Sequence, residues 1–252
     1  MNVQYCSDLH LEFKQNSNYI KAHPLKPVGD VLVLAGDIVP FGIVNKQNSF
    51  FDYVSDNFTN TYWIPGNHEY YGFDAAKKSG IVNEKIRSNV FLVNNTAIAE
   101  DEVRFIFSTL WTKISPANEW QIERGMSDFQ AIRYNEYRFS TPIYNELHEG
   151  CLQFIKEQVE QNFTGKTIVV THHVPTFMNY PLKYKGDVLN EAFAVELYPL
   201  IENSGVDYWV YGHHHSNIPD FNIGKTKMLT NQLGYVQYGE EELFDNAKTI
   251  GL

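Results

Sequence analysis

Histidine and acidic residues are concentrated in five short segments of this 252-residue chain, where they could bind metal ions. Seven of the nine histidines lie in these segments, which are DLH (8–10), GD (36–37), GNHE (66–69), HH (172–173) and HHH (213–215). Imidazole and carboxylate ligands without paired cysteines suit borderline to hard divalent ions and disfavour a structural thiolate zinc site. The residue types therefore indicate a catalytic metal site.

The number of candidate ligands favours two ions over one. A single ion takes about four to six ligands. The segments offer seven, namely Asp8, His10, Asp37, Asn67, His172, His213 and His215. We expect two divalent ions, drawn from Mn, Fe, Zn, Ni and Co, to share these ligands. Two ions bridged by an aspartate and a hydroxide suit phosphoryl transfer, because they clamp both the attacking and the leaving oxygen.

The elements that must position these residues are short strands, because each segment follows a run of β-forming residues. The runs are 2–7, 30–36, 61–66, 166–171 and 206–212, and two more lie at 89–93 and 103–110. Several runs are nearly all apolar, as in strands that are buried on both faces. In open α/β sheets the carboxyl ends of the strands form the ligand-binding edge, so we expect one shared site.

Helices and hairpins complete the predicted α/β fold. Residues 48–58 and 151–163 place apolar side chains on one helical face, which predicts covering helices. Residues 218–239 combine glycines with β-formers, which predicts hairpins that close the sheet. Residues 111–142 mix aromatics, arginines and turn residues. We expect this stretch to be a lid inserted into a single domain that spans 1–252.

Composition narrows the classes of function. The chain is 43% hydrophobic, which suffices for one sizeable core. Its net charge of -10 disfavours binding of duplex nucleic acid, which needs a basic face. No stretch has the length and apolarity of a membrane span and no signal peptide is visible, so we expect a cytoplasmic protein. The two cysteines, Cys6 and Cys151, fit a reducing compartment.

The five segments, in this order and at the ends of strands, resemble the motifs of the calcineurin-like metallophosphoesterases. The resemblance extends from residue 8 to residue 215 and implies a four-layer α-β-β-α sandwich, with two mixed β-sheets packed face to face and helices outside. It also implies one ion held by Asp8, His10 and His215, a second held by Asn67, His172 and His213, and Asp37 as the bridge. His68 would face the substrate as general acid or charge stabiliser.

The resemblance further implies an enzyme that hydrolyses a small phosphomonoester or phosphodiester. Protein phosphatases of this superfamily carry an aspartate where this chain has Pro40, so a small stand-alone bacterial-type phosphohydrolase fits better. Two alternatives stay open. One is a nuclease or nucleotide phosphodiesterase acting on short nucleic acids or cyclic nucleotides, and the other is a non-catalytic metal-binding interaction module.

Aromatic and arginine side chains of the predicted lid and near the GNHE segment are the candidates for recognition of the substrate. Five residues could stack on an organic group or neutralise a further phosphate. They are Tyr71, Trp111, Arg124, Arg133 and Arg138. The alternative is that the aromatic residues only pack the lid onto the sandwich. We expect His173 and His214 to be supporting imidazoles and not ligands, with Glu69 in a structural role.

Overall fold

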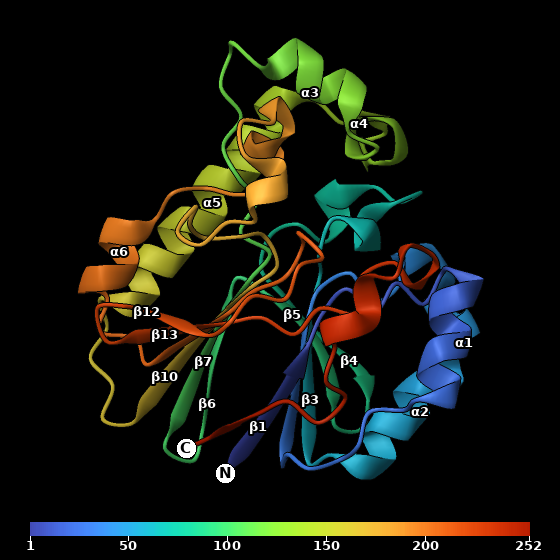
Figure 1. Ribbon diagram of the computed structural model, residues 1–252, viewed down its shortest axis with the longest axis vertical. Coiled ribbons are helices and arrows are strands. Elements are labelled where there is room, and N and C mark those ends of the chain that lie inside the picture. Colours follow the sequence, from blue (N-terminus) through green and yellow to red (C-terminus); the bar gives the residue numbers. More distant parts are fainter.

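Two β-sheets of six strands each form the centre of the structure, a computed structural model that describes residues 1–252 (Figure 1). In the first sheet four parallel strands lie between two antiparallel edge strands. Its order is β14 (Thr249–Gly251), β1 (Asn2–Cys6), β2 (Val31–Ala35), β3 (Asn60–Ile64), β5 (Val90–Asn94) and β4 (Val82–Arg87).

The second sheet repeats this plan. Four parallel strands again lie between antiparallel edges. The order is β12 (Phe221–Ile223), β13 (Thr226–Leu229), β11 (Tyr208–Val210), β10 (Lys166–Thr171), β7 (Val103–Ser108) and β6 (Thr96–Glu100). All seven strands expected from apolar runs are confirmed, and β12 and β13 form the hairpin expected within 218–239.

Apolar side chains from both sheets form the core between them. Val33 of β2 and Tyr62 of β3 belong to one buried cluster with Phe105 and Phe107 of β7 and Val170 of β10. The whole of β2 and the whole of β7 are buried, as the apolar runs predicted. Because strands bury both faces only when both are covered, each sheet also needs helices on its outer face.

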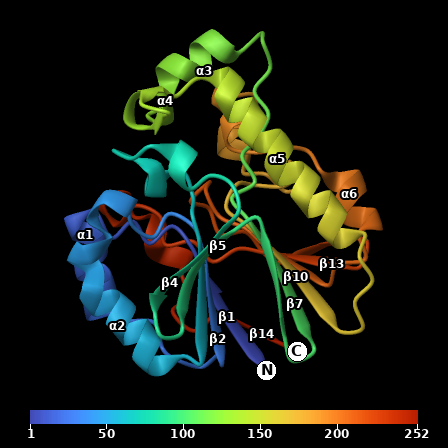
Figure 2. The same ribbon diagram turned by 180° about the vertical axis from the view of Figure 1, so that it is seen from behind.

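Helices cover the two outer faces (Figure 2). They are α1 (Lys14–Ala22) and α2 (Asn48–Asn57) on the first sheet, and α5 (Thr141–Val159) and α6 (Tyr198–Asn203) on the second. Phe51 of α2 packs with Trp63 of β3, and Ile155 of α5 lies in one buried cluster with Trp209 of β11. These layers confirm the α-β-β-α sandwich.

Residues 111–142 leave the second sheet and lie above the strand ends, at the top of Figure 1. They contain α3 (Glu119–Gly125), α4 (Asp128–Ala131) and a hairpin of β8 (Arg133–Tyr134) and β9 (Tyr137–Arg138). Ile122, Phe129 and Phe139 are fully buried in the cluster under α5, which anchors the segment. No helix of the structure is both long and apolar enough to span a membrane.

Candidate metal centre

The five segments predicted to carry ligands meet at the carboxyl ends of strands from both sheets. Asp8 and His10 follow β1, Asp37 follows β2 and Asn67 follows β3. From the second sheet, His172 follows β10, and His213 and His215 follow β11. All seven side chains belong to one site, and six of them are buried, with His215 half-buried.

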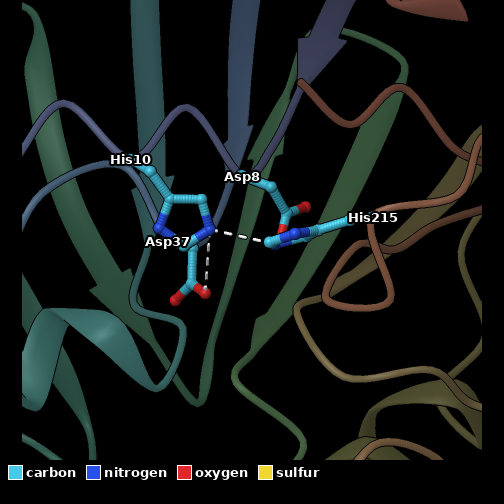
Figure 3. Close-up of side chains that lie close together, drawn as sticks. All are labelled: Asp8, His10, Asp37 and His215. Carbon is cyan, nitrogen blue, oxygen red and sulfur yellow. Dashed lines mark hydrogen bonds and ion pairs between the residues drawn. The ribbon is translucent and has the colours of Figure 1, made fainter. Parts of the chain in front are cut away.

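One group of donor atoms is formed by Asp8, His10, Asp37 and His215, whose ligand atoms lie within 4.8 Å of one another (Figure 3). Nε2 of His10 lies 3.0 Å from Nε2 of His215 and 3.7 Å from Oδ2 of Asp37. Nε2 of His215 lies 3.3 Å from Oδ1 of Asp8. Two carboxylates and two imidazoles thus converge on one point.

A second group lies beside the first and shares Asp37 with it. Asp37, His172 and His213 again offer ligand atoms within 4.8 Å of one another. Nε2 of His172 lies 3.1 Å from Nδ1 of His213 and 3.2 Å from the side-chain oxygen of Asn67. The two groups therefore have the composition that the resemblance implied, with Asp37 in contact with both.

Three of the imidazoles are fixed by hydrogen bonds from the ring nitrogen that faces away from the centre. Nδ1 of His10 donates to Glu12, Nδ1 of His215 to Glu240 at 2.8 Å, and Nδ1 of His172 to the carbonyl of Ala35 at 3.0 Å. Such bonds set the tautomer and leave the inner nitrogen free to accept a metal, as is usual for metal-ligating histidines.

The charges at the centre also fit divalent cations. Asp8 and Asp37 are buried carboxylates that form ion pairs only with histidines, and neither pairs with a lysine or arginine. A buried charge needs compensation from a partner or a metal. Burial alone would favour neutral imidazoles, but Asp8 and Glu240 raise the pKa of His215 to about 10, and Asp37 raises the pKa of His172 to about 9. Bound cations would replace these protons.

The backbone at the centre is held in conformations that side chains rarely adopt. Five of the seven candidate ligands have positive φ, namely Asp8, His10, Asp37, His213 and His215. Such strain persists only where the surrounding structure imposes it, and it clusters at functional sites. Glycines make room for the ligands. A Cβ on Gly66 would lie 2.2 Å from Asp37 Oδ1, and one on Gly212 would lie 2.5 Å from Asp8 Oδ2.

The carboxylate of Glu69 holds part of this backbone in place through hydrogen bonds. Its buried carboxylate accepts hydrogen bonds from the backbone nitrogens of Asp37 at 2.9 Å, Ile38 at 2.7 Å and Gly66 at 2.6 Å, and from the indole of Trp63 at 3.0 Å. Burial and the charge of Asp37 raise the pKa of Glu69 to about 8. Glu69 thus ties the loops after β2 and β3 together, in line with the structural role expected for it.

His68 lies next to the metal groups but outside both. Its Nδ1 donates to Oε1 of Glu12 at 2.9 Å, the same oxygen that accepts from His10, and its ring stacks on Tyr71 with 4.1 Å between centroids. Its Nε2 lies 3.3 Å from the hydroxyl of Tyr235. Burial opposes a charge here, but Asp37 and Glu12 outweigh it and raise the pKa of His68. The surroundings therefore favour a protonated ring.

The other two histidines of the segments have partners outside the metal groups. His173 Nδ1 donates to the carbonyl of Thr109 at 3.2 Å, and His214 Nδ1 accepts from the amide of Gln232 at 2.9 Å. Burial, with the charge of His172, lowers the pKa of His173 to about 3, and burial lowers that of His214 to about 4. Both are neutral near pH 7. Their positions agree with the expectation that they support the site without binding metal.

A cavity of about 460 Å³ opens over the metal groups. Among the five residues suggested for substrate recognition, only Tyr71 lines it. Trp111 is fully buried in the core under α5. Arg124, Arg133 and Arg138 are exposed and none of them lines the cavity. Arg124 lies over the ring of Trp120, and Arg138 donates to the carbonyl of Phe129.

Three carboxylates that contact predicted site residues were not singled out from the sequence. Glu12 holds His10 and His68, Glu240 holds His215, and Asp128 accepts from Asn67 at 2.9 Å and from the hydroxyl of Tyr71 at 2.7 Å. Glu12 has a signal in the sequence, because it lies two residues after His10 in the stretch DLHLE. Asp128 and Glu240 belong to no motif and reach the site only through the fold.

Comparisons with known proteins agree with this geometry. A family model described as calcineurin-like phosphoesterase matches residues 1–217. An uncharacterized protein of Acanthamoeba polyphaga mimivirus is 31% identical over an alignment of 260 residues. The alignment covers 92% of this chain and 91% of the viral protein. A solved structure of phosphopantetheinyl hydrolase from Mycobacterium tuberculosis is similar in fold, with a TM-score of 0.73, 14% identity, and coverage of 99% of this chain and 95% of that chain.

Proposed function

The chain belongs to the calcineurin-like phosphoesterase family and is a metal-dependent phosphoesterase, and we propose that it hydrolyses a small phosphomonoester or phosphodiester at the centre below the cavity. One observation carries the proposal: two groups of ligand atoms share Asp37, and His68 lies beside them on the cavity wall. Divalent cations bound there would supply Lewis-acid polarisation and charge neutralisation of the phosphate.

Each group would hold one ion. Asp8, His10, His215 and Asp37 would bind the first, while Asn67, His172, His213 and Asp37 would bind the second. The hydrogen bonds from Glu12, Glu240 and the Ala35 carbonyl orient the rings of His10, His215 and His172 before any ion arrives. Such preorganisation lowers the cost of assembling the site.

The residues of the chain also account for the proton that hydrolysis requires. A water oxygen attacks phosphorus from the side opposite the ester oxygen, a new P–O bond forms, and the bond to the leaving oxygen breaks. The attacking water releases a proton to solvent, and solvent returns a proton to the acid after the leaving group departs. His68 is suited to donate a proton to that leaving oxygen, because its ring lines the cavity and its raised pKa favours the charged form. Glu12 holds the ring through Nδ1, so Nε2 is the nitrogen that would donate to the substrate, in place of the Tyr235 hydroxyl that lies 3.3 Å from it.

Turnover of p-nitrophenyl phosphate and of bis(p-nitrophenyl) phosphate by protein loaded with Mn tests the proposal. We expect hydrolysis of at least one ester well above the rate of buffer with Mn alone. A protein that binds Mn but hydrolyses neither ester would contradict the proposal and favour a non-catalytic metal-binding module. Comparison of the two esters also separates monoesterase from diesterase activity, and a short oligonucleotide in the same assay tests for a nuclease.

A further inference from the structure

Part of the cavity lining forms an apolar wall, which comes from the segment 111–142 and from the loops after β10. Met126, from the segment 111–142, lines it together with Leu189 and Phe193 from the loops that follow β10. The ring of Phe193 stacks on His213, with 4.5 Å between centroids and 26° between planes. The apolar surface therefore begins directly at a candidate metal ligand and leads outward from it.

The two segments that supply this wall are packed against each other. A Cβ on Gly125 would lie 2.9 Å from Cδ2 of Leu189, so the absence of a side chain at Gly125 lets Leu189 approach α3 closely. The cavity is also lined by the aromatic rings of Phe13, Tyr71 and Tyr235. An organic group attached to a phosphate at the metal centre would lie between aromatic and aliphatic surfaces.

Apart from the histidines at the metal centre, the cavity lining has no positive side chain. None of the 16 lining residues is a lysine or arginine, and the one acidic residue at the outer part, Glu240, accepts hydrogen bonds from His215 and from the backbone of Tyr235. The cation next to the cavity is Lys183, which is exposed and lies over the ring of the lining residue Tyr184, 4.7 Å from its centroid, but is not itself part of the lining. Beyond the metal centre, a second phosphate would meet apolar groups, the neutral hydroxyls of Ser127 and Tyr184 and the carboxylate of Glu240, and would lose hydration without a cation in the lining to compensate.

On the basis of the proposed function, we propose that the cavity selects esters with a single phosphate and an uncharged, largely apolar alkyl or aryl group. Esters whose organic group carries a second phosphate are discriminated against. The substrate class is thus set by Met126, Leu189 and Phe193, and not by the arginines of the segment 111–142.

A matched pair of substrates tests this selectivity. Hexyl phosphate and 1,6-hexanediol bisphosphate have the same reacting ester and the same alkyl chain, and differ only in the distal phosphate. With protein loaded with Mn, we expect kcat/KM to be higher for hexyl phosphate by about tenfold or more, because the distal phosphate would have to lose its hydration. Equal values, or a preference for the bisphosphate, would overturn the inference.

Variants of the apolar wall test whether it causes the preference for esters with a single phosphate. Leu189→Lys and Met126→Lys each place a cation on the apolar wall and should shift the kcat/KM ratio toward the bisphosphate. Leu182→Lys is the matched control, because Leu182 is 83% exposed and lies outside the cavity, and it should leave the ratio unchanged. An unchanged ratio in both wall variants, with circular dichroism showing that they are folded, would refute the role of the wall.

Binding measurements separate this inference from the proposed function. Hexylphosphonate and 1,6-hexanediphosphonate cannot be hydrolysed, so calorimetry on the wild-type protein loaded with Mn reports recognition alone. We expect tighter binding of the monophosphonate. If no ester is hydrolysed, bis(p-nitrophenyl) phosphate included, but the monophosphonate is still preferred, the proposed function falls and the selectivity stands. If hydrolysis occurs but the diphosphonate binds as tightly or more tightly, only the selectivity falls.

Discussion

Asp128 of α4 accepts a hydrogen bond from the side-chain amide of Asn67, with 2.9 Å between Asn67 Nδ2 and Asp128 Oδ1. Because the amide nitrogen is held in this way, the amide oxygen faces Nε2 of His172 at 3.2 Å. The same carboxylate oxygen accepts from the hydroxyl of Tyr71 at 2.7 Å. The segment above the strand ends is thereby joined to the metal centre through one fully buried carboxylate.

Removal of this carboxylate should weaken metal binding. In Asp128→Ala the amide of Asn67 loses its orienting partner, so we expect affinity for one of two Mn ions to fall by roughly 10- to 100-fold in calorimetric titrations. Asp128→Asn keeps an oxygen that can accept from the amide and should retain most of the affinity. Tyr71→Phe is the control, because it keeps the 2.9 Å bond from Asn67 to Asp128 and removes only the Tyr71 hydroxyl, whose contact with the Asn67 amide is the longer one at 3.5 Å. Unaltered binding of both ions by Asp128→Ala would show that Asp128 does not position Asn67.

The histidine triplet should separate ligands from a supporting residue. His213→Ala and His215→Ala each remove a donor atom from one group, so each should lower the metal content of the purified protein. His214→Ala should leave the metal content unchanged, because the Nδ1 of His214 already accepts a hydrogen bond from Gln232. The content is measured by mass spectrometry of the metals. A site emptied by His214→Ala alone would contradict the assignment of these three residues.

The ligand groups could be predicted from the sequence because each ligand directly follows a strand. Once the apolar runs before Asp8 and Asp37 are recognised as parallel strands, their ends are expected at one edge of a sheet. His172 follows a strand of the second sheet, so its approach to them depends on the face-to-face packing of the two sheets, which only the resemblance implied. His213 and His215 could be predicted from the spacing of their motif, in which they lie on either side of His214, a residue whose side chain has partners outside the metal groups. The apolar runs alone indicated an α/β fold, and the four-layer sandwich was implied by the resemblance that the five polar segments carry.

Residues whose placement depends on packing could not be predicted in this way. Asp128 and Glu240 reach the centre only because the segment 111–142 and the loop after β13 fold back over it. Trp111 carries no sequence signal that separates the core position it occupies from a cavity wall. The strands β4 and β6 were not predicted from the sequence, because they are half exposed and lack a continuous apolar run.

His68 should affect the chemical step more than binding. If it protonates the leaving oxygen, His68→Asn should lower kcat for an alkyl phosphate by roughly 10²- to 10⁴-fold and leave metal content unchanged. With p-nitrophenyl phosphate the loss should be small, since p-nitrophenolate leaves without a proton. Comparison of kcat for both esters decides the point. Equal losses would indicate charge stabilisation in place of proton donation, and loss of a metal ion would identify His68 as a ligand.

Metal binding should release protons near neutral pH. In the metal-free protein the pKa is about 10 for His215 and about 9 for His172, so both rings are protonated at pH 7. A metal ion binds only the neutral form, so two ions should displace about two protons, and affinity should increase as pH rises toward 10. Calorimetry in buffers of different ionisation enthalpy counts the protons. Binding heats that do not depend on the buffer would contradict these pKa values.

The central claim is that two ions sharing Asp37 are needed for ester hydrolysis. The most direct test is a titration of the chelated, metal-free protein with Mn, in which bound metal and hydrolysis of p-nitrophenyl phosphate or its bis ester are followed in the same sample. We predict no activity without metal and a rise that ends at about two ions per chain. Full activity in the metal-free protein, or activity complete at one bound ion, would contradict the account.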